Sequence, residues 1–341
     1  MKPTVHDIAA HAGVSLATVD RVLNGRAGVR APTRERVEAA ISALGFVRDV
    51  AAANLAKGRI YRFTFILPAN DNSFMIGLRR QVEEAIQWAG RERVSIRIVD
   101  VPAFDDAALA AALEQAGEDA IDGIAFVAVD SGAVRDVVER LAERGTILVT
   151  LVSDLAGSRR HHFAGIDNIA AGQTAATLMC RFLGARSGKI LPIAGSLQVQ
   201  DHRDRLKGFS DHVARSYPCR ALLPVVEGAD NPERVAALLR EALRHREDIA
   251  GIYSFGAGNR GLLTVLEEGR GQEAPVVIVH ELTEISRQGL LGGRIDAVLN
   301  QDAGHEVRSA LRVLKAGADG AALLAAQERI RIDIFLKENL P

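Results

Sequence analysis

The stretch Thr4–Gly25, TVHDIAAHAGVSLATVDRVLNG, determines how the beginning of this 341-residue chain folds. Thr4 can cap a helix whose apolar residues recur every three or four positions, and Gly13 permits a sharp reversal directly after that helix. Ser15 can cap a second helix over residues 16–23, and the asparagine-glycine pair that follows can close it. Two short helices joined by a tight turn predict a helix-turn-helix, whose second helix can enter the major groove of DNA.

The residues after this stretch extend the helical region. Pro32 stands where a third helix can begin, apolar residues follow at positions 37, 41 and 44, and Gly45 can end the helix. A weaker helical pattern covers residues 50–56. We therefore expect a DNA-binding domain over residues 1–48 and a hinge or linker over residues 49–60.

Charge is unevenly distributed along the chain. Residues 1–60 contain nine lysines and arginines against five acidic residues, a net charge of +4, whereas the remaining 281 residues carry a net charge of −5. Phosphates attract basic residues whatever the base sequence, so a basic beginning on an acidic body favours a DNA-binding module joined to a domain with another task.

From residue 61 onward the pattern alternates between strands and helices. Strands are expected at 62–67, 94–99, 123–128, 146–151, 189–194, 221–226, 250–255 and 275–280, and helices at 75–90, 106–116, 132–144, 169–183, 203–215, 232–245 and 259–268. Such alternation predicts α/β lobes with doubly wound parallel sheets. We expect lobe 1 at about 61–163 and 301–327, and lobe 2 at about 164–300 and 328–341. A ligand would then bind between the lobes, beyond the carboxyl ends of the strands.

The opening stretch closely resembles the head of the lactose/galactose repressor (LacI/GalR) family, whose approximate pattern is T-x-x-D-V-A-x-x-A-G-V-S-x-x-T-V-S-R-V-L-N. The later segments RERV (34–37) and LGF (44–46) are also similar to that family. The resemblance implies an all-α helix-turn-helix head followed by a two-lobed sensor like a periplasmic binding protein. It further implies a homodimer that binds near-palindromic operator DNA under the control of a small-molecule effector. Induction and corepression use the same architecture and stay open as alternatives.

The resemblance also assigns DNA contacts. Leu16 and Ala17 occupy the base-contacting positions, where apolar side chains favour thymine methyl groups, and Arg21 is the candidate for a guanine edge. Leu55 matches the leucine that wedges into the minor groove. Asp20 departs from the family, which usually has serine there, and an acid beside phosphate needs a partner such as Arg21 or Arg26. The complete set of expected DNA-binding residues is Thr4, Ser15, Leu16, Ala17, Thr18, Arg21, Asn24, Asn54 and Leu55.

Polar and aromatic residues that follow the expected strands are candidates for the effector site. Arg205 lies in RLKGF (205–209), which resembles the family's R-L-x-G-F helix start, and Glu281 stands where the family usually has a ligand-binding aspartate. Carboxylates, amides, an arginine and an aromatic ring suit a polyhydroxylated ligand such as a sugar. The expected ligand-binding residues are Asn70, Asn72, Phe74, Asp130, Ser153, Asp154, His202, Arg205, Phe255, Glu281 and Gln301.

Other functional classes find less support in the sequence. GAGNRG (256–261) is a literal GxGxxG between a strand and a helix, with an acid twenty residues on, so a nucleotide-binding α/β enzyme is an alternative. A solute-binding protein is a second alternative, disfavoured by the DNA-binding head. No G-x-S-x-G is present, the histidines fit no metal-ligand spacing, and the two cysteines form no CxxC. We expect no enzymatic activity, cofactor, metal or membrane partner, and a cytoplasmic location.

Overall fold

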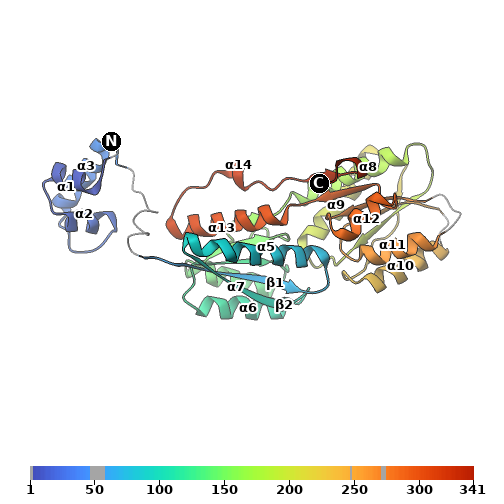
Figure 1. Ribbon diagram of the computed structural model, residues 1–341, viewed down its shortest axis with the longest axis horizontal. Helices are drawn as coiled ribbons and strands as arrows, with labels where there is room; N and C mark the ends of the chain where they lie inside the picture. The colour runs from blue at the N-terminus through green and yellow to red at the C-terminus, as the bar shows by residue number, and fades with distance from the viewer. Residues whose placement is uncertain (1–2, 47–57, 246–247, 270–273) are drawn as a thin grey trace. The chain divides into compact units, whose positions relative to one another are not determined.

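The computed structural model describes residues 3–46, 58–245, 248–269 and 274–341 (Figure 1). The chain divides into two compact units, Met1–Arg59 and Ile60–Pro341, which are taken separately below. The weak helix expected at 50–56, together with Asn54 and Leu55, lies outside the described residues.

The described residues of the first unit form three helices, each at the place that the sequence predicts. They are α1 (Val5–Ala12), α2 (Leu16–Leu23) and α3 (Ala31–Leu44). Thr4 and Ser15 cap α1 and α2 with their side chains, and Gly13 takes the left-handed conformation (φ +62°) that reverses the chain between these helices. Ile8, Val19 and Val37, one from each helix, meet in a small core. All of these core residues belong to the first unit, so α2 is held in place by packing within that unit.

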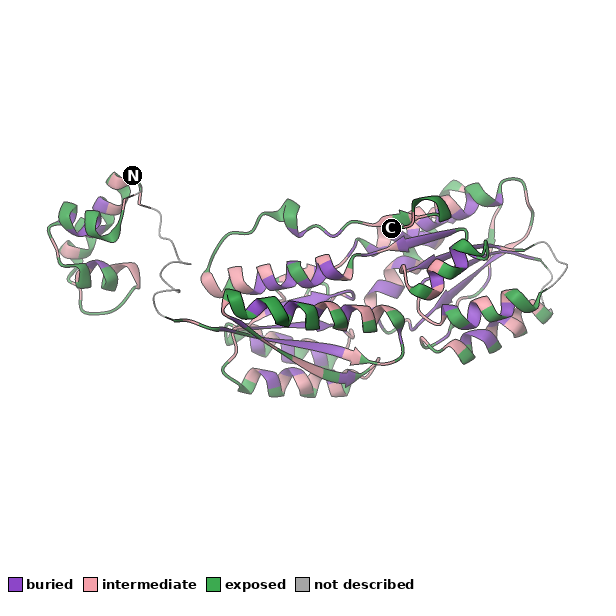
Figure 2. Cartoon of the chain, in the orientation of Figure 1, coloured by how far each residue is buried: buried purple, intermediate pink, exposed green. Residues whose placement is uncertain are grey.

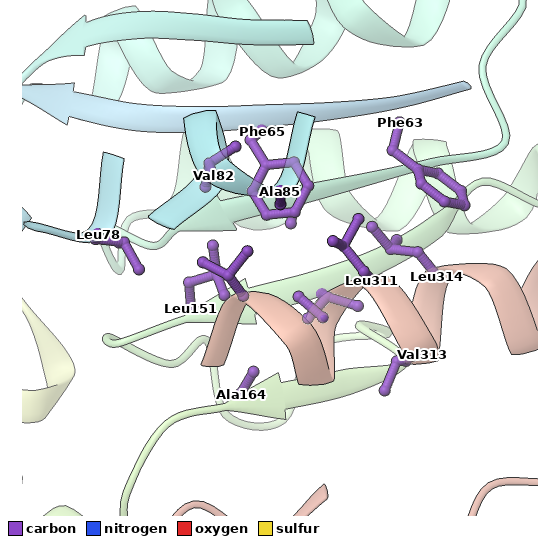
Figure 3. Packing of buried hydrophobic residues seen from close by; sticks show 14 of the residues in the cluster. Phe63, Phe65, Leu78, Val82, Ala85, Leu151, Ala164, Leu311, Val313 and Leu314 are labelled. Carbon is purple, nitrogen blue, oxygen red and sulfur yellow. The ribbon is translucent and has the colours of Figure 1, made fainter. Parts of the chain in front are cut away.

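A five-stranded parallel sheet forms the first lobe of the second unit. Its strand order is β2-β1-β3-β4-β5, with β1 (Tyr61–Ala69), β2 (Val94–Pro102), β3 (Gly123–Val127), β4 (Ile147–Leu151) and β5 (His162–Ala164). One face is covered by α5 (Ser73–Ala89) and α13 (Ala303–Asp319), and the other by α6 (Asp106–Glu118) and α7 (Gly132–Glu143), while η1 (Gly90–Glu92) is a single turn. Figure 3 shows how Phe63 and Phe65 of β1 pack against Val82 of α5 and Leu311 of α13.

The second lobe contains a seven-stranded sheet of order β12-β11-β10-β9-β6-β7, with β8 also paired to β6. The strands are β6 (Lys189–Ala194), β7 (Ala221–Leu222), β8 (Val226–Glu227), β9 (Ile249–Ser254), β10 (Val276–His280), β11 (Ala297–Asn300) and β12 (Asp333–Phe335). Pairing is parallel except between β11 and β12. One face carries α8 (Asn168–Leu183) and α9 (Gln200–Ser216), and the other α10 (Pro232–His245), α11 (Asn259–Glu268) and α12 (Glu284–Leu291). Figure 2 shows the buried strands as the centre of each lobe.

The main difference from the expected strands concerns residues 221–226. Two short strands, β7 and β8, replace the single strand, and Pro224 stands between them. Proline has no backbone N–H and so interrupts a sheet ladder, which accounts for the break. The sequence analysis also did not anticipate β5, β11, β12, α12 or α13.

The chain passes between the two lobes three times within the described residues. It crosses from β5 to α8, returns from β11 to α13, and crosses again from α14 (Ala325–Glu328) to β12, after which η2 (Lys337–Asn339) precedes the end. Each lobe is therefore built from segments distant in sequence. None of the described helices combines the length and the apolar composition that spanning a membrane requires.

Candidate functional site

The exposed face of α2 brings together the residues expected to contact DNA. Ser15, Leu16, Ala17 and Arg21 are exposed, and Leu16 keeps 43% of its surface accessible although it is a large apolar residue. The Ser15 hydroxyl lies 3.0 Å from that of Thr18 and accepts the Thr18 N–H, so these residues also fix the start of the helix. This exposed helix start has the geometry that reading a major groove requires.

Asp20 is held by partners at the end of α2. Asn24 donates its amide to one Asp20 carboxylate oxygen at 2.7 Å, and the Arg26 guanidinium donates to the other at 3.3 Å. Of the two arginines considered from the sequence, Arg26 is therefore the partner. This leaves the Arg21 side chain out of the Asp20 ion pair. Thr4 accepts the Asp7 N–H in a capping box, so its hydroxyl has a structural task at the start of α1.

A cavity lies between the two lobes of the second unit, at the carboxyl ends of their strands. Residues from the ends of β1, β2 and β3 line it from the first lobe, and residues that follow β9, β10 and β11 line it from the second. This is where ligands bind in open parallel sheets. Nine of the expected ligand-binding residues line the cavity: Asn70, Asn72, Phe74, Ser153, His202, Arg205, Phe255, Glu281 and Gln301.

Asp130 does not line the cavity, which corrects the expectation for this residue. One of its carboxylate oxygens pairs with Arg135 of α7 at 2.7 Å. The other accepts from Arg203 of α9 at 2.8 Å. Because Arg203 belongs to the second lobe, Asp130 forms an ion pair across the lobes instead of holding a ligand.

Asp154 is likewise turned away from the cavity. The Arg160 guanidinium contacts both of its carboxylate oxygens, and the Thr150 hydroxyl donates to one of them at 2.8 Å. The same carboxylate accepts the Leu155 N–H. These bonds fix the loop after β4, and Asp154 is not among the residues that line the cavity, so a ligand contact by Asp154 stays a prediction.

Arg205 is the centre of the buried polar network. Its guanidinium donates to Asn168 Oδ1 at 2.8 Å, to the Phe255 carbonyl at 3.1 Å and to Glu281 Oε1 at 3.2 Å. The side chain is only 3% exposed, so the Glu281 carboxylate is its needed counter-charge. Gln301 donates its amide to Glu281 Oε1 at 2.9 Å and its backbone N–H to Oε2 at 3.2 Å.

Two glycines set the position of Arg205. A Cβ on Gly172 of α8 would lie 2.1 Å from the Arg205 carbonyl oxygen, and one on Gly208 of α9 would lie 2.2 Å from the Ile169 carbonyl oxygen. No side chain fits at either place, so α8 and α9 pack backbone against backbone. This close packing brings Asn168 within reach of the guanidinium.

The cavity wall contains four residues other than glycine in the left-handed backbone region. They are Phe104 (φ +60°), Val152 (φ +61°), Asp230 (φ +55°) and Glu281 (φ +67°). Val152 is β-branched, for which this conformation is especially unfavourable. Backbone strain of this kind concentrates at ligand-binding sites, where it aims side chains at the ligand.

Burial controls ionisation at the second-lobe side of the cavity. It raises the pKa of the Glu281 carboxyl, against the opposing influence of Arg205 and of the hydrogen bonds from Gln301. It lowers the pKa of His280 well below its usual range, and the positive charge of Arg205 acts in the same direction. His280 is therefore a neutral ring whose Nε2 shares a 2.9 Å hydrogen bond with the Tyr253 hydroxyl.

Several contacts join the two lobes around the cavity. Asn72 caps α5 with its side-chain oxygen and donates its amide to Asp230 Oδ2 of the second lobe at 2.8 Å. The Gln200 N–H donates to the Ser153 hydroxyl at 3.2 Å. Together with the Asp130–Arg203 pair, these contacts link the two lobes through polar side chains.

The sequence analysis missed several residues of the cavity wall. Asp230 stands four residues beyond the strand expected at 221–226, and Asp105 caps α6. Further lining residues outside the expected ligand-binding set include Asp71, Phe104, Asp201, Asn259, Arg260, His280 and Thr283.

The GxGxxG loop at 256–261 lines this cavity, but its glycines serve packing. A Cβ on Gly256 would lie 2.1 Å from the Gly195 backbone nitrogen, and one on Gly261 would lie 1.8 Å from the Pro232 carbonyl oxygen. The Ala257 N–H, which would face a pyrophosphate, donates to Asp230 Oδ1 at 2.8 Å. A carboxylate of the chain itself holds this position, so the loop does not support dinucleotide binding. Among the described residues, no group of three or more histidines, cysteines or acids is placed to hold a metal ion.

Comparison with known proteins finds a family match for each of the two units. The family model for bacterial regulatory proteins of the lacI family matches residues 4–49, and that for a periplasmic binding protein domain matches residues 63–322. The chain belongs to the lacI family of bacterial regulatory proteins. This LacI-family chain is therefore a DNA-binding transcription regulator whose second unit is a periplasmic binding protein domain.

Two regulators illustrate the relationship. The maltose regulon regulatory protein MalI of Escherichia coli is 27% identical over 266 residues, which cover 74% of this chain and 72% of MalI. Catabolite control protein A of Priestia megaterium is 25% identical over 301 residues, which cover 88% of this chain and 80% of that protein. Both alignments extend well beyond the DNA-binding head.

Solved structures share the fold of the second unit. GanP, a glucose-galactose binding protein from Geobacillus stearothermophilus, superposes with a TM-score of 0.75 at 19% identity, covering 83% of this chain and 99% of GanP. The arabinose binding protein AraP from the same organism gives a TM-score of 0.64 at 22% identity, with 82% and 98% covered.

Proposed function

We propose that this LacI-family regulator binds operator DNA through α2 and that a sugar or sugar derivative, held between the two lobes, controls its DNA affinity. The observation that carries the proposal is the cavity itself. It joins buried amides, carboxylates and Arg205 to the rings of Phe74 and Phe255 at the carboxyl ends of two parallel sheets. Vicinal hydroxyls suit such carboxylates and amides, and a sugar ring face suits the aromatic side chains.

The DNA contacts divide by chemistry. Leu16 and Ala17 would meet thymine methyl groups and Arg21 a guanine edge, so these three specify the sequence. Ser15 and Thr18 would contact phosphates and fix the register. Thr4, Asn24, Asn54 and Leu55 complete the proposed set. We place the DNA-binding domain at 1–48, the linker at 49–60 and the sensor at 61–341.

The proposed working unit is a homodimer in the cytoplasm. Two heads would occupy successive major grooves of a near-palindromic operator. Ligand binding would change the balance of the contacts that cross the lobes, such as Asn72 with Asp230 and Asp130 with Arg203. The effector shifts DNA affinity only by as much as it binds one lobe arrangement better than the other.

Selection of fragmented genomic DNA on the purified full-length protein, at moderate salt, tests the DNA-binding part. We expect enrichment of one near-palindromic site, and the genes beside it identify the pathway of the effector. Arg21→Ala is expected to abolish the enrichment, whereas Arg36→Ala on α3 is the matched control that lies outside the proposed contact set. Enrichment that is unchanged by Arg21→Ala would contradict the assigned readout.

A further inference from the structure

The charge of the cavity wall is strongly unbalanced. Five acidic residues line it, against the two arginines Arg205 and Arg260: Asp71, Asp105, Asp201, Asp230 and Glu281. Counted as ionised groups, these side chains give the wall a formal excess of three negative charges. A neutral sugar carries no charge that would balance this excess. The hydrogen-bond and ion-pair partners of each acid therefore show which carboxylate lacks compensation within the chain.

Three of the acids are compensated within the chain. Glu281 pairs with Arg205 at 3.2 Å and accepts two hydrogen bonds from Gln301. Asp230 accepts from the Ala257 N–H and from the Asn72 amide. Asp105 accepts the Ala108 N–H at the start of α6. Each of these three carboxylates therefore has at least one hydrogen-bond donor within the chain.

Asp201 differs from these three. Its side chain is 7% exposed, and the basic group that it faces is His202, whose Nε2 lies 3.7 Å from Oδ2. Within the described part of the chain, its buried Oδ1 has no hydrogen-bond partner. The first turn of α9 offers a partial positive charge, worth about 0.3–1 kcal/mol at such positions. That is less than the several kcal/mol that burying an ion costs, so Asp201 calls for a further partner.

Gln301 supplies an independent indication in the same cavity. Its side-chain nitrogen donates to Glu281, while its Oε1 is buried and unpartnered in the part of the chain that the structure describes. Gln301 is 2% exposed. Asp201 Oδ1 and Gln301 Oε1 are both acceptors, so a hydrogen-bond donor on the ligand would match each of them.

The negative charge of Asp201 also reaches its neighbours. It contributes to the raised pKa of Glu281, of Asp204 and of the fully buried Glu306, in each case alongside burial as the larger cause. A cation placed beside Asp201 would offset this unfavourable field at several carboxyl groups at once.

We propose that the effector presents an ammonium group to Asp201, and hence that it is an amino sugar or amino polyol and not a neutral sugar. An ammonium group has three donors and no acceptor, which matches unpartnered acceptors in a cavity of negative charge. The proposal rests on the proposed function, because it specifies the chemistry of the ligand in that same cavity.

Isothermal titration of the full-length protein tests this charge preference. The probes are D-glucosamine, D-galactosamine and D-mannosamine, each beside its neutral parent hexose and its N-acetyl derivative, with 1-amino-1-deoxysorbitol beside sorbitol. We expect at least one aminated probe to bind about tenfold or more tightly than both its parent and its N-acetyl form, the advantage of a charged hydrogen bond. Asp201→Asn should remove most of that preference, whereas Asp211→Asn, on the exposed face of α9, should keep it.

Every other pattern overturns the proposal. Equal or tighter binding of a neutral probe, binding by no aminated probe, or a preference that survives Asp201→Asn would each exclude the assigned contact. Selection of genomic DNA by the ligand-free protein does not depend on this charge. Enrichment of an operator with neutral sugar binding would therefore leave the proposed function standing and remove only the ammonium group.

Discussion

Replacing Arg205 with alanine provides the most direct measurement of the buried network. The change removes hydrogen bonds to Asn168, to the Phe255 carbonyl and to Glu281. It also leaves the Glu281 carboxylate buried without its counter-charge. Breaking a buried pair from one side costs about 3–5 kcal/mol. With a urea slope of about 2–3 kcal/mol per molar, the midpoint of the sensor transition should fall by about 1–2 M.

Circular dichroism during urea unfolding of the full-length protein measures this midpoint. Arg215→Ala is the matched control, because Arg215 lies on the same helix, is exposed and donates to the backbone oxygen of Asp211. Adding Glu281→Gln to Arg205→Ala removes the stranded charge and should recover part of the loss. A loss below about 1 kcal/mol for Arg205→Ala would place the pair among weak surface ion pairs and refute the reasoning.

Three further changes test other parts of the structure. Gly172→Ala forces a Cβ to within 2.1 Å of the Arg205 carbonyl oxygen and should cost about 1–3 kcal/mol in urea unfolding, whereas equal stability would show that α8 and α9 separate easily. Glu306→Gln should raise the thermal midpoint more at pH 8 than at pH 5. Burial raises the pKa of Glu306 well above its usual range, so the folded state binds an extra proton and loses stability as the pH rises above about 4.5; the same gain at both pH values would rule this out. Asp20→Ser frees Arg26 for phosphate and should steepen the salt dependence of operator affinity by about one unit of log–log slope for each head, hence by about two units for the proposed homodimer, and an unchanged slope in fluorescence anisotropy titrations would contradict that role.

The parts of the molecule that depend on local chemistry could be predicted from the sequence. Thr4 and Ser15 cap the helices expected of them because a cap hydrogen-bonds within three residues. The doubly wound sheets followed from the alternation of apolar strands and amphipathic helices. Short edge strands such as β5 and β12 were not predicted, because a hydrophobic pattern over three residues cannot be distinguished from that of a loop.

The lining of the cavity could be predicted where a residue directly follows a strand, as Glu281 follows β10, or where a motif resembles the family, as RLKGF does at Arg205. Arg205 and Glu281 meet at the cavity, although they are 76 residues apart. Asp130 also follows a strand, yet its partner Arg203 lies 73 residues away, and no local signal indicates that the two form a pair across the lobes. Asp230 was missed because its placement depends on a left-handed turn after a strand that Pro224 shortens.

The three chain crossings between the lobes have a mechanical consequence. Three covalent links between the lobes resist sliding and favour rotation of one lobe against the other. Gln301 lies on one of these links, between β11 and α13. Because it is close to the rotation axis, its displacement is small when the lobes rotate. Asn72, at the start of α5, lies on no link and swings through a longer arc. A ligand group bound to Gln301 would thus stay nearly in place during the rotation. A ligand group that contacts Asn72 would be coupled to the larger displacement of that residue.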